Sequence, residues 1–163
     1  MHINIDSREK PRAITRILEE FDRQGIEYIT NKLYVGDYCY LENPLFIIDR
    51  KQNIGEIAQN ATSGHDRFKR ELIRLDEMGA RMVVLVEQNR YKDIRGEWQT
   101  VKSVEDLMFW QNPHGVVDGV RIYKILSTWE HKHNVTFRFC QKDQTGKKII
   151  ELLDWGVEHV KNC

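Results

Sequence analysis

The feature that most constrains the fold is the sequence RMVVLVE at residues 81–87. Five consecutive apolar residues, three of them valines, are typical of a strand that is covered on both faces. The run is far shorter than the roughly 20 apolar residues that span a bilayer, and no other run approaches that length. We therefore expect a central strand of an α/β sheet and no membrane-spanning segment.

Helical and strand patterns surround this run. Ile14, Ile17 and Phe21 form an apolar stripe at helical spacing in a helix that follows Pro11 and ends near Gly25. Further strands are expected at residues 2–6, 26–29, 38–41, 45–51 and 135–139, and further helices at 54–60, 66–78, 103–110, 122–129 and 147–160. We expect the second to fourth of these strands to form an antiparallel meander, residues 89–100 to form a polar loop, and the later strands to be joined by parallel crossovers. The pattern predicts an α/β protein, a mixed β-sheet flanked by α-helices, in a single domain over residues 1–163.

Composition excludes several other classes of protein. With 40% hydrophobic and 31% charged residues, the chain is neither disordered nor fibrous. The first ten residues, MHINIDSREK, lack the pattern of a secretory signal, so a cytoplasmic protein is expected. Three widely spaced cysteines and histidines that share no helix face predict free thiols and no zinc site. Because the formal net charge is zero, binding to nucleic acid would have to rest on local patches.

One candidate for a catalytic site lies at the end of the strand at residues 45–51. Asp49 and Lys51 are two residues apart, so their side chains project from the same face of a strand. Asp37 lies in a Gly-Asp turn beside a strand that we expect to neighbour this one. Two carboxylates can bind Mg²⁺, which prefers oxygen ligands, and a lysine can orient water or stabilise phosphoryl oxygens. An Asp-x-Lys sequence at a strand end is more often a solvated edge, so this motif alone leaves both interpretations open.

Four short motifs occur in order: DSRE at residues 6–9, VGDY at 35–38, IDRK at 48–51 and RFKREL at 67–72. Together they resemble the nuclease domain of XPF-type structure-specific endonucleases, which has a restriction-endonuclease-like fold. The resemblance carried by motifs covers about residues 2–88. Residues 112–126 and 137–153 resemble small phage-type and bacterial members without sharp motifs.

The resemblance implies roles for particular residues. Asp37 and Asp49 would bind Mg²⁺ or Mn²⁺, with the carbonyl group of Arg50 as a further ligand, and Lys51 would serve catalysis. Asp6 and Glu9 would border this catalytic site. It also implies a homodimer, for which the apolar stripes at residues 122–129 and 150–160 are the candidate face.

The chain departs from the family pattern at three points. The family has glutamate where this chain has Asp49, and an acidic residue where it has Gly55. Glu56 follows one position later, where it either replaces the missing metal ligand or stabilises a helix start. The sequence also contains no helix-hairpin-helix module, which larger members use for DNA binding and dimerisation.

Arg67, Arg70 and Arg74 recur at helical spacing and form a basic ridge on one flank of the helix at residues 66–78. With Arg8 and Lys69 they are the expected DNA contacts; the alternative is a solvated face in which Glu71 pairs with the arginines. Trp98, in the polar segment, could stack on an unpaired base.

These observations favour an Mg²⁺-dependent endodeoxyribonuclease that hydrolyses phosphodiester bonds, acting on branched, flapped or junction DNA in repair or recombination. Two alternatives stay open: a catalytically inactive DNA-binding or regulatory subunit of the same fold, and a sequence-specific restriction or mobile-element nuclease.

Overall fold

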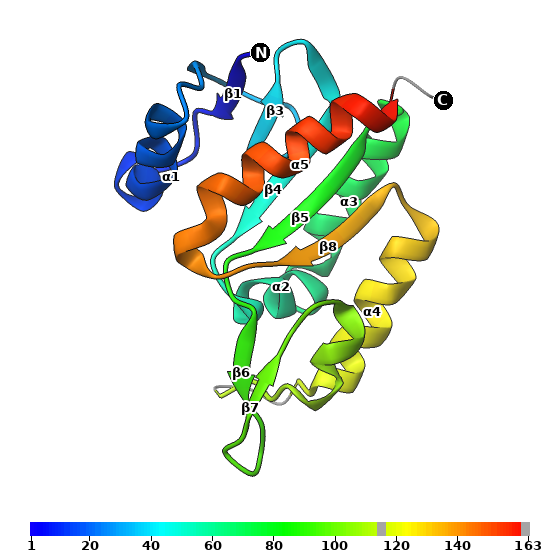
Figure 1. The fold of residues 1–163 in the computed structure, drawn as a ribbon. Coiled ribbons are helices and arrows are strands. Elements are labelled where there is room, and N and C mark those ends of the chain that lie inside the picture. Colours follow the sequence, from blue (N-terminus) through cyan, green and yellow to red (C-terminus); the bar gives the residue numbers. More distant parts are fainter. Residues whose placement is uncertain (114–116, 161–163) are drawn as a thin grey trace.

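A computed structural model describes residues 1–113 and 117–160 of the chain. A six-stranded sheet in the order β2-β1-β3-β4-β5-β8 forms its centre, and a two-stranded β6–β7 hairpin projects beyond one end (Figure 1). The strands are β1 Ile3–Asp6, β2 Tyr28–Asn31, β3 Tyr38–Tyr40, β4 Asn43–Lys51, β5 Arg81–Val86, β6 Arg90–Lys92, β7 Trp98–Thr100 and β8 Val135–Phe139. The helices are α1 Pro11–Arg23, α2 Ile54–Ala61, α3 His65–Glu77, α4 Gly119–Lys132 and α5 Thr145–Val160, with 3₁₀ helices η1 Val104–Phe109 and η2 Lys142–Gln144. None of the helices in the described part of the chain is long and apolar enough to cross a membrane.

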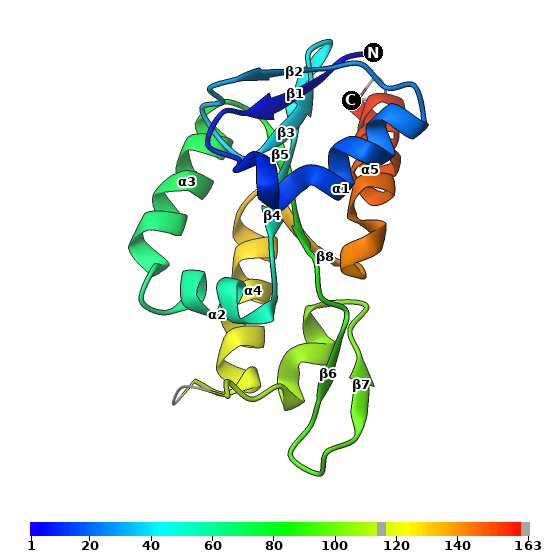
Figure 2. The same ribbon diagram turned by 90° about the vertical axis from the view of Figure 1, so that its left-hand side faces the viewer.

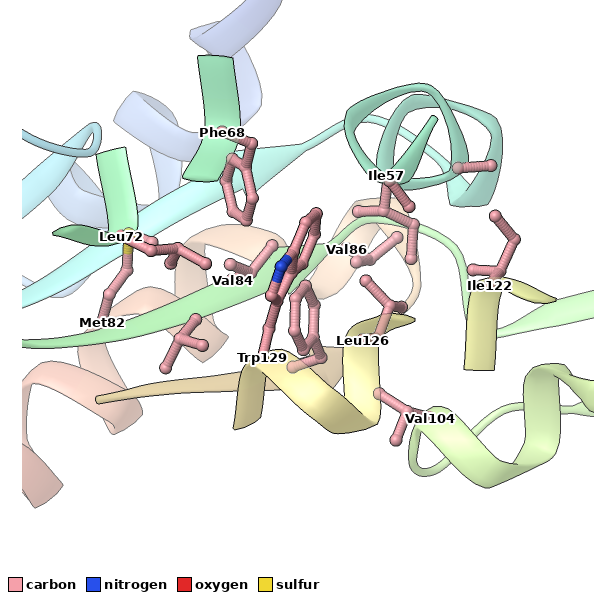
Figure 3. Close-up of a cluster of buried hydrophobic side chains, with 14 of the residues drawn as sticks. Ile57, Phe68, Leu72, Met82, Val84, Val86, Val104, Ile122, Leu126 and Trp129 are labelled. Atoms are coloured by element: carbon pink, nitrogen blue, oxygen red, sulfur yellow. The ribbon is translucent and has the colours of Figure 1, made fainter. Parts of the chain in front are cut away.

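Helices cover both faces of the sheet. Figure 2 shows α1 and α5 on one face and α2, α3 and α4 on the other. Each face has its own buried cluster. The cluster under α1 and α5 includes Phe21, Tyr38 and Phe46. The cluster under α3 and α4 includes Phe68, Leu72 and Trp129, which pack with Val84 and Val86 of β5 (Figure 3).

The expected central strand is confirmed. β5 pairs in parallel with β4 on one side and with β8 on the other, and its residues from Met82 to Val86 are buried. The fold class predicted from the sequence, an α/β mixed sheet flanked by helices, is therefore the observed one.

The expected meander is wrong in one strand. β3 and β4 pair antiparallel, but β2 pairs in parallel with β1, at the edge of the sheet. β1 lies between β2 and β3, so the chain returns through α1 to form a βαβ unit before it turns back. The apolar pattern of residues 26–29 indicates a strand but does not specify which strand pairs with it. The sequence therefore did not predict the position of β2 in the sheet.

The expected loop at residues 89–100 is also wrong, because these residues form the β6–β7 hairpin. Its inner face is anchored by the buried side chains of Tyr91 and Val101. The two strands are only three residues each, too short to give a recognisable alternation among polar neighbours.

The apolar stripes that were candidates for a dimer face are core in this fold. Ile122, Leu126 and Trp129 are buried under the sheet on one side, and Ile150 and Leu153 on the other. They are therefore not available to a second copy, and the homodimer itself stays a prediction. Cys39 and Cys140 are buried free thiols, whereas Cys163 and part of the stretch 112–126 lie outside the described residues.

Candidate active site

The end of β4 places Asp49 and Lys51 on the face of the sheet that α3 covers. Alternate residues of the strand point to opposite faces, so Ile47 shares the α3 side with these two residues. Lys51 Nζ lies 2.5 Å from Asp49 Oδ2, and both side chains are nearly buried. The ammonium group also lies 5.7 Å from the centre of the Phe68 ring in α3. A carboxylate and a lysine thus share one buried site, as the spacing of the two residues predicts.

The turn before β3 brings Asp37 to the same site. Gly36 has a positive φ of 69°, and a Cβ atom there would meet Ile47 at 2.3 Å, so only glycine fits this turn. The backbone N–H group of Asp37 donates to the carbonyl group of Ile48 at 2.8 Å. Asp37 Oδ2 in turn accepts from the N–H group of Arg50 at 2.8 Å. The second carboxylate is therefore held by the backbone of β4 itself.

Glu71 of α3 is a third carboxylate at this site that sequence reasoning assigned only as a partner of the arginines. Its Oε1 accepts weakly from the N–H group of Gly36 at 3.4 Å. Burial raises its pKa, the charge of Asp49 raises it further, and Lys51 opposes this shift. Glu71 follows Phe68 by three residues and precedes Leu75 by four, so it flanks the buried stripe of α3. That position is the signal that could have found it.

Arg50 points to the other face of the sheet. Its side chain is buried, and it donates from Nε to Glu9 Oε2 and from Nη1 to Glu87 Oε2, both at 2.9 Å. Glu9 also accepts from the hydroxyl group of Tyr38 at 2.9 Å. Glu9 therefore belongs to a buried ionic network behind the candidate active site. Glu9 still borders the site, as the resemblance implies, because its charge raises the pKa of Asp37. A catalytic role for Glu9 stays a prediction.

Asp6 at the end of β1 also forms a buried network of hydrogen bonds. Its buried carboxylate accepts from the backbone and guanidinium groups of Arg8 at 2.6–2.8 Å and from the N–H group of Leu33 at 3.0 Å. These bonds lower its pKa against the opposing effect of burial. With these acceptor sites filled, the carboxylate of Asp6 holds Arg8 and the backbone of Leu33 in place. A catalytic role for Asp6 stays a prediction. The backbone of Asp6 still supports the site, because its N–H group donates to the carbonyl group of Asp37 at 2.8 Å.

Glu56 stabilises the start of α2. Its Oε2 accepts from the N–H group of Gln52 at 2.7 Å, while the side chain of Asn53 accepts from the N–H group of Glu56 at 2.9 Å. This reciprocal pair satisfies two N–H groups at the start of the helix. The helix-stabilising alternative is therefore the arrangement that the structure shows, and a role of Glu56 towards a metal stays a prediction.

The expected basic ridge lies beside Glu71 on α3. Arg67 and Arg70 are exposed, and Arg74 is half-buried with its guanidinium group 5.6 Å from the centre of the Tyr34 ring. The buried Nε of Arg74 has no hydrogen-bond partner among the residues that the structure describes. Lys69 is exposed on the opposite flank of the helix, about 200° around the axis from Arg67, so it does not belong to this ridge. Arg8 lies within electrostatic range of the candidate site. Its hydrogen bond with Asp6 raises the pKa of the guanidinium group, and the charges of Asp37 and Glu71 raise this pKa more weakly.

The charges at the site fit a divalent cation. Burial raises the pKa of Asp37 well above its usual value, and Asp49 raises it further. Burial lowers the pKa of Lys51, but Asp49 and Asp37 outweigh this effect and raise it. Asp49 Oδ2 is buried and makes an ion pair with Lys51 but no hydrogen bond of good geometry. One ammonium group thus faces more buried negative charge than it can balance.

The side chains available as ligands limit which metal ion the site can bind. Within residues 1–113 and 117–160, no three histidine, cysteine, aspartate or glutamate side chains gather closely enough to form a ready-made metal cluster. Asp37 and Asp49 are the two carboxylates that the resemblance implies as metal ligands, and the charge of Asp49 reaches Asp37. Mg²⁺ and Mn²⁺ suit such a site, because Mg²⁺ in particular keeps several waters and takes the rest of its ligands from substrate phosphate.

Fold and site together define the class: a mixed sheet between two helical layers, with two carboxylates and a lysine where adjacent strands meet, as in restriction-endonuclease-like nucleases. The sequence matches the ERCC4 domain over residues 5–153, so the chain belongs to the ERCC4-domain family. The resemblance to XPF-type nucleases is thereby confirmed. Among curated protein sequences, none matches the chain significantly.

Solved structures support the same fold. XPF from Aeropyrum pernix superposes with a TM-score of 0.66 at 15% identity, over 99% of this chain and 68% of that one. XPF from Aeropyrum pernix in complex with DNA gives a TM-score of 0.65 at 18% identity, over 96% of this chain and 65% of that one. This chain thus spans about two thirds of the length of those proteins. Family and fold together support a DNA endonuclease of the XPF family.

Proposed function

We propose that the protein is a divalent-metal-dependent endonuclease that hydrolyses phosphodiester bonds in branched or flapped DNA. The observation that carries this proposal is the meeting of Asp37, Asp49 and Lys51 on one face of the sheet, at the adjoining ends of β3 and β4. Branched DNA as the substrate follows from the family, and an XPF structure in complex with DNA supports DNA as the partner.

Each residue of the site has a distinct part in the proposed reaction. Asp37 and Asp49 would hold Mg²⁺ or Mn²⁺, which when bound lowers the pKa of water and offsets charge that develops on the phosphoryl group. The backbone N–H group of Arg50 fixes the orientation of Asp37. Lys51 lies at hydrogen-bonding distance from Asp49, so its ammonium group can orient the attacking water or stabilise the phosphoryl oxygens.

The basic ridge offers a place for the DNA backbone beside these groups. Arg67 and Arg70 are exposed on the same stripe of α3 as Glu71, which reaches the Gly36 turn. Phosphates held there would lie next to the carboxylates. Such contacts bind DNA without reading its sequence, which suits an enzyme that selects a DNA shape.

The test is digestion of duplex, flap, fork and four-way-junction DNA of matched sequence, with Mg²⁺, with Mn²⁺ and with EDTA. We expect cleavage of a branched substrate with either metal and none with EDTA. Asp37→Asn and Lys51→Ala should each abolish cleavage, and Asp37→Asn should also weaken Mn²⁺ binding measured by electron paramagnetic resonance.

Matched controls are Asp66→Asn and Lys132→Ala, which remove the same charges from exposed positions on α3 and α4. Cleavage by Asp37→Asn or Lys51→Ala at the rate of these controls would refute the site. Binding without cleavage by the wild-type chain would favour the inactive subunit. Cleavage of plain duplex at one defined sequence would favour the sequence-specific nuclease.

A further inference from the structure

The β6–β7 hairpin has an inner face and an outer face with different chemistry. Tyr91 pairs with Gln99 on the inner face, where Tyr91 is buried and its hydroxyl group donates to the carbonyl group of Asp106 at 2.7 Å. Lys92 pairs with Trp98 and Arg90 with Thr100 on the outer face. The inner face therefore anchors the hairpin on η1, and the outer face is left to solvent.

The outer face combines an exposed indole ring with two cations. Trp98 is 57% exposed, although a large aromatic side chain gains by burial. The guanidinium group of Arg90 lies 4.9 Å from the centre of its ring, and Lys92 Nζ lies 5.3 Å from it. Among the described residues, neither cation has a carboxylate within ion-pair distance. Within the described part of the chain, the contacts given for these three residues are thus the cation–π contacts among themselves, and the indole ring stays largely open to solvent.

Hydrogen bonds close the turn at the tip of the hairpin. The carboxylate of Asp93 accepts from the N–H groups of Arg95 and Glu97 at 2.9 and 3.0 Å, and from the side chain of Gln99 at 2.9 Å. Gly96 closes this turn with a φ of 78°. A turn held by its own hydrogen bonds reduces the conformational entropy lost on binding, which favours binding by its strands.

The base of the hairpin is tied to the end of the catalytic strand. The backbone N–H group of Glu87 donates to the carbonyl group of Lys51 at 2.8 Å. The side chain of Gln88 accepts from the N–H group of Ile54, which starts α2, and donates to the carbonyl group of Arg90. Figures 1 and 2 show the hairpin projecting from the end of the sheet where β4 and β5 end. A strand of DNA on the hairpin would therefore be held at the same end of the sheet as Asp49 and Lys51.

We propose that the outer face of the hairpin binds a single-stranded segment of the DNA substrate, with a base stacked on Trp98 and phosphates on Arg90 and Lys92. Stacking on an indole ring requires a base whose flat face is free, which an unpaired segment offers and an intact duplex does not. This inference rests on the proposed function. It adds a binding surface that would select DNA with unpaired strands.

The test measures binding by fluorescence anisotropy in EDTA, where no cleavage occurs. The probes are a labelled single strand, a fork with unpaired arms and a fully paired duplex. Trp98→Ala should weaken binding to the single strand and the fork by about 5- to 100-fold, the range for loss of one base–aromatic stack. Binding to the duplex should not change. Trp98→Phe, which keeps an aromatic ring, should retain most of the wild-type affinity for the single strand and the fork.

Charge removal gives a separate readout. Arg90→Ala combined with Lys92→Ala should weaken binding to the single strand and reduce its salt dependence by about 1 to 2 in log–log slope. Phe109→Ala is the matched control, because Phe109 is a 69% exposed aromatic residue on neighbouring η1, away from this face. It should bind all three probes as the wild type does.

Equal losses on duplex and single strand after Trp98→Ala, or no loss at all, would overturn the proposal. Circular dichroism spectra that match the wild type establish that the variants fold. The binding result does not depend on catalysis. A wild-type chain that cuts no DNA substrate refutes the proposed function. Normal cleavage by the wild type, together with wild-type DNA binding by Trp98→Ala, refutes only the proposed role of the hairpin.

Discussion

Replacing Arg50 with alanine tests whether the middle residue of the catalytic tripeptide is structural. Its guanidinium group is 4% exposed and lies 2.9 Å from carboxylates of Glu9 and of Glu87, whose side chains are 12% and 2% exposed. Arg50→Ala would leave both carboxylates buried without a cation. Breaking a buried ion pair in this way costs about 3–5 kcal/mol of the free energy of unfolding. For a chain of this size the melting temperature would fall by about 6–20 °C.

Urea denaturation followed by circular dichroism measures this change. Arg23→Ala is the control, because Arg23 pairs with Glu20 on an exposed helix surface and its loss should leave stability unchanged within error. Adding Glu9→Gln and Glu87→Gln to Arg50→Ala should recover part of the loss, since the stranded charges are then gone. A loss below about 1 kcal/mol for Arg50→Ala, as for an exposed pair, would refute the argument that this network stabilises the fold.

Three other variants test single features of the site. Arg70→Ala should weaken DNA binding alike for all sequences and reduce its salt slope by about 1, measured by anisotropy across salt concentrations; an unchanged slope would exclude this ridge. Glu56→Gln should leave turnover at limiting Mg²⁺ near that of the wild type if Glu56 only stabilises α2, whereas a large loss with a raised Mg²⁺ requirement would assign it to the metal. Burial and Asp49 raise the pKa of Asp37, so the folded metal-free chain binds more protons there than the unfolded chain, and its stability should fall as pH rises above about 4. Asp37→Asn should reduce that fall in urea denaturation with EDTA, whereas Glu71, whose pKa is also raised, keeps its own contribution. An undiminished fall in the variant would contradict the assignment.

Much of the fold was predictable because its strongest signals are local. The apolar run at residues 81–87 and the stripe of Phe68, Leu72 and Leu75 identify a buried strand and a helix without reference to the rest of the chain. The pairing of β2 with β1 depends on contacts between distant segments, and no local pattern specifies them. The hairpin was missed for another reason, since a single buried residue in β6 gives no periodicity.

The residues of the candidate site also fall into two groups, those that local patterns predict and those that depend on contacts between distant segments. Asp37, Asp49 and Lys51 were found because alternation along a strand and a glycine turn fix where side chains point. The ion pair of Glu9 with Arg50 could not be predicted, because Arg50 also pairs with Glu87, a residue that lies 78 positions after Glu9 in the sequence. The sequence shows only that Glu71 flanks the buried stripe of α3, and the packing of this helix is what places its carboxylate against the Gly36 turn.

The tripeptide of residues 49–51 serves both faces of one strand, and this explains why its order matters. Asp49 and Lys51 face α3 and carry the proposed chemistry, whereas Arg50 faces α1 and holds Glu9 and Glu87. Its backbone N–H group meanwhile holds Asp37, so the arginine joins the structural network to the reactive carboxylate through the strand itself. A shift of one residue in β4 would exchange the two faces, placing a guanidinium group against α3 and leaving two glutamates unpaired behind the sheet. The buried network therefore opposes any register of β4 other than the one in which Asp37, Asp49 and Lys51 meet.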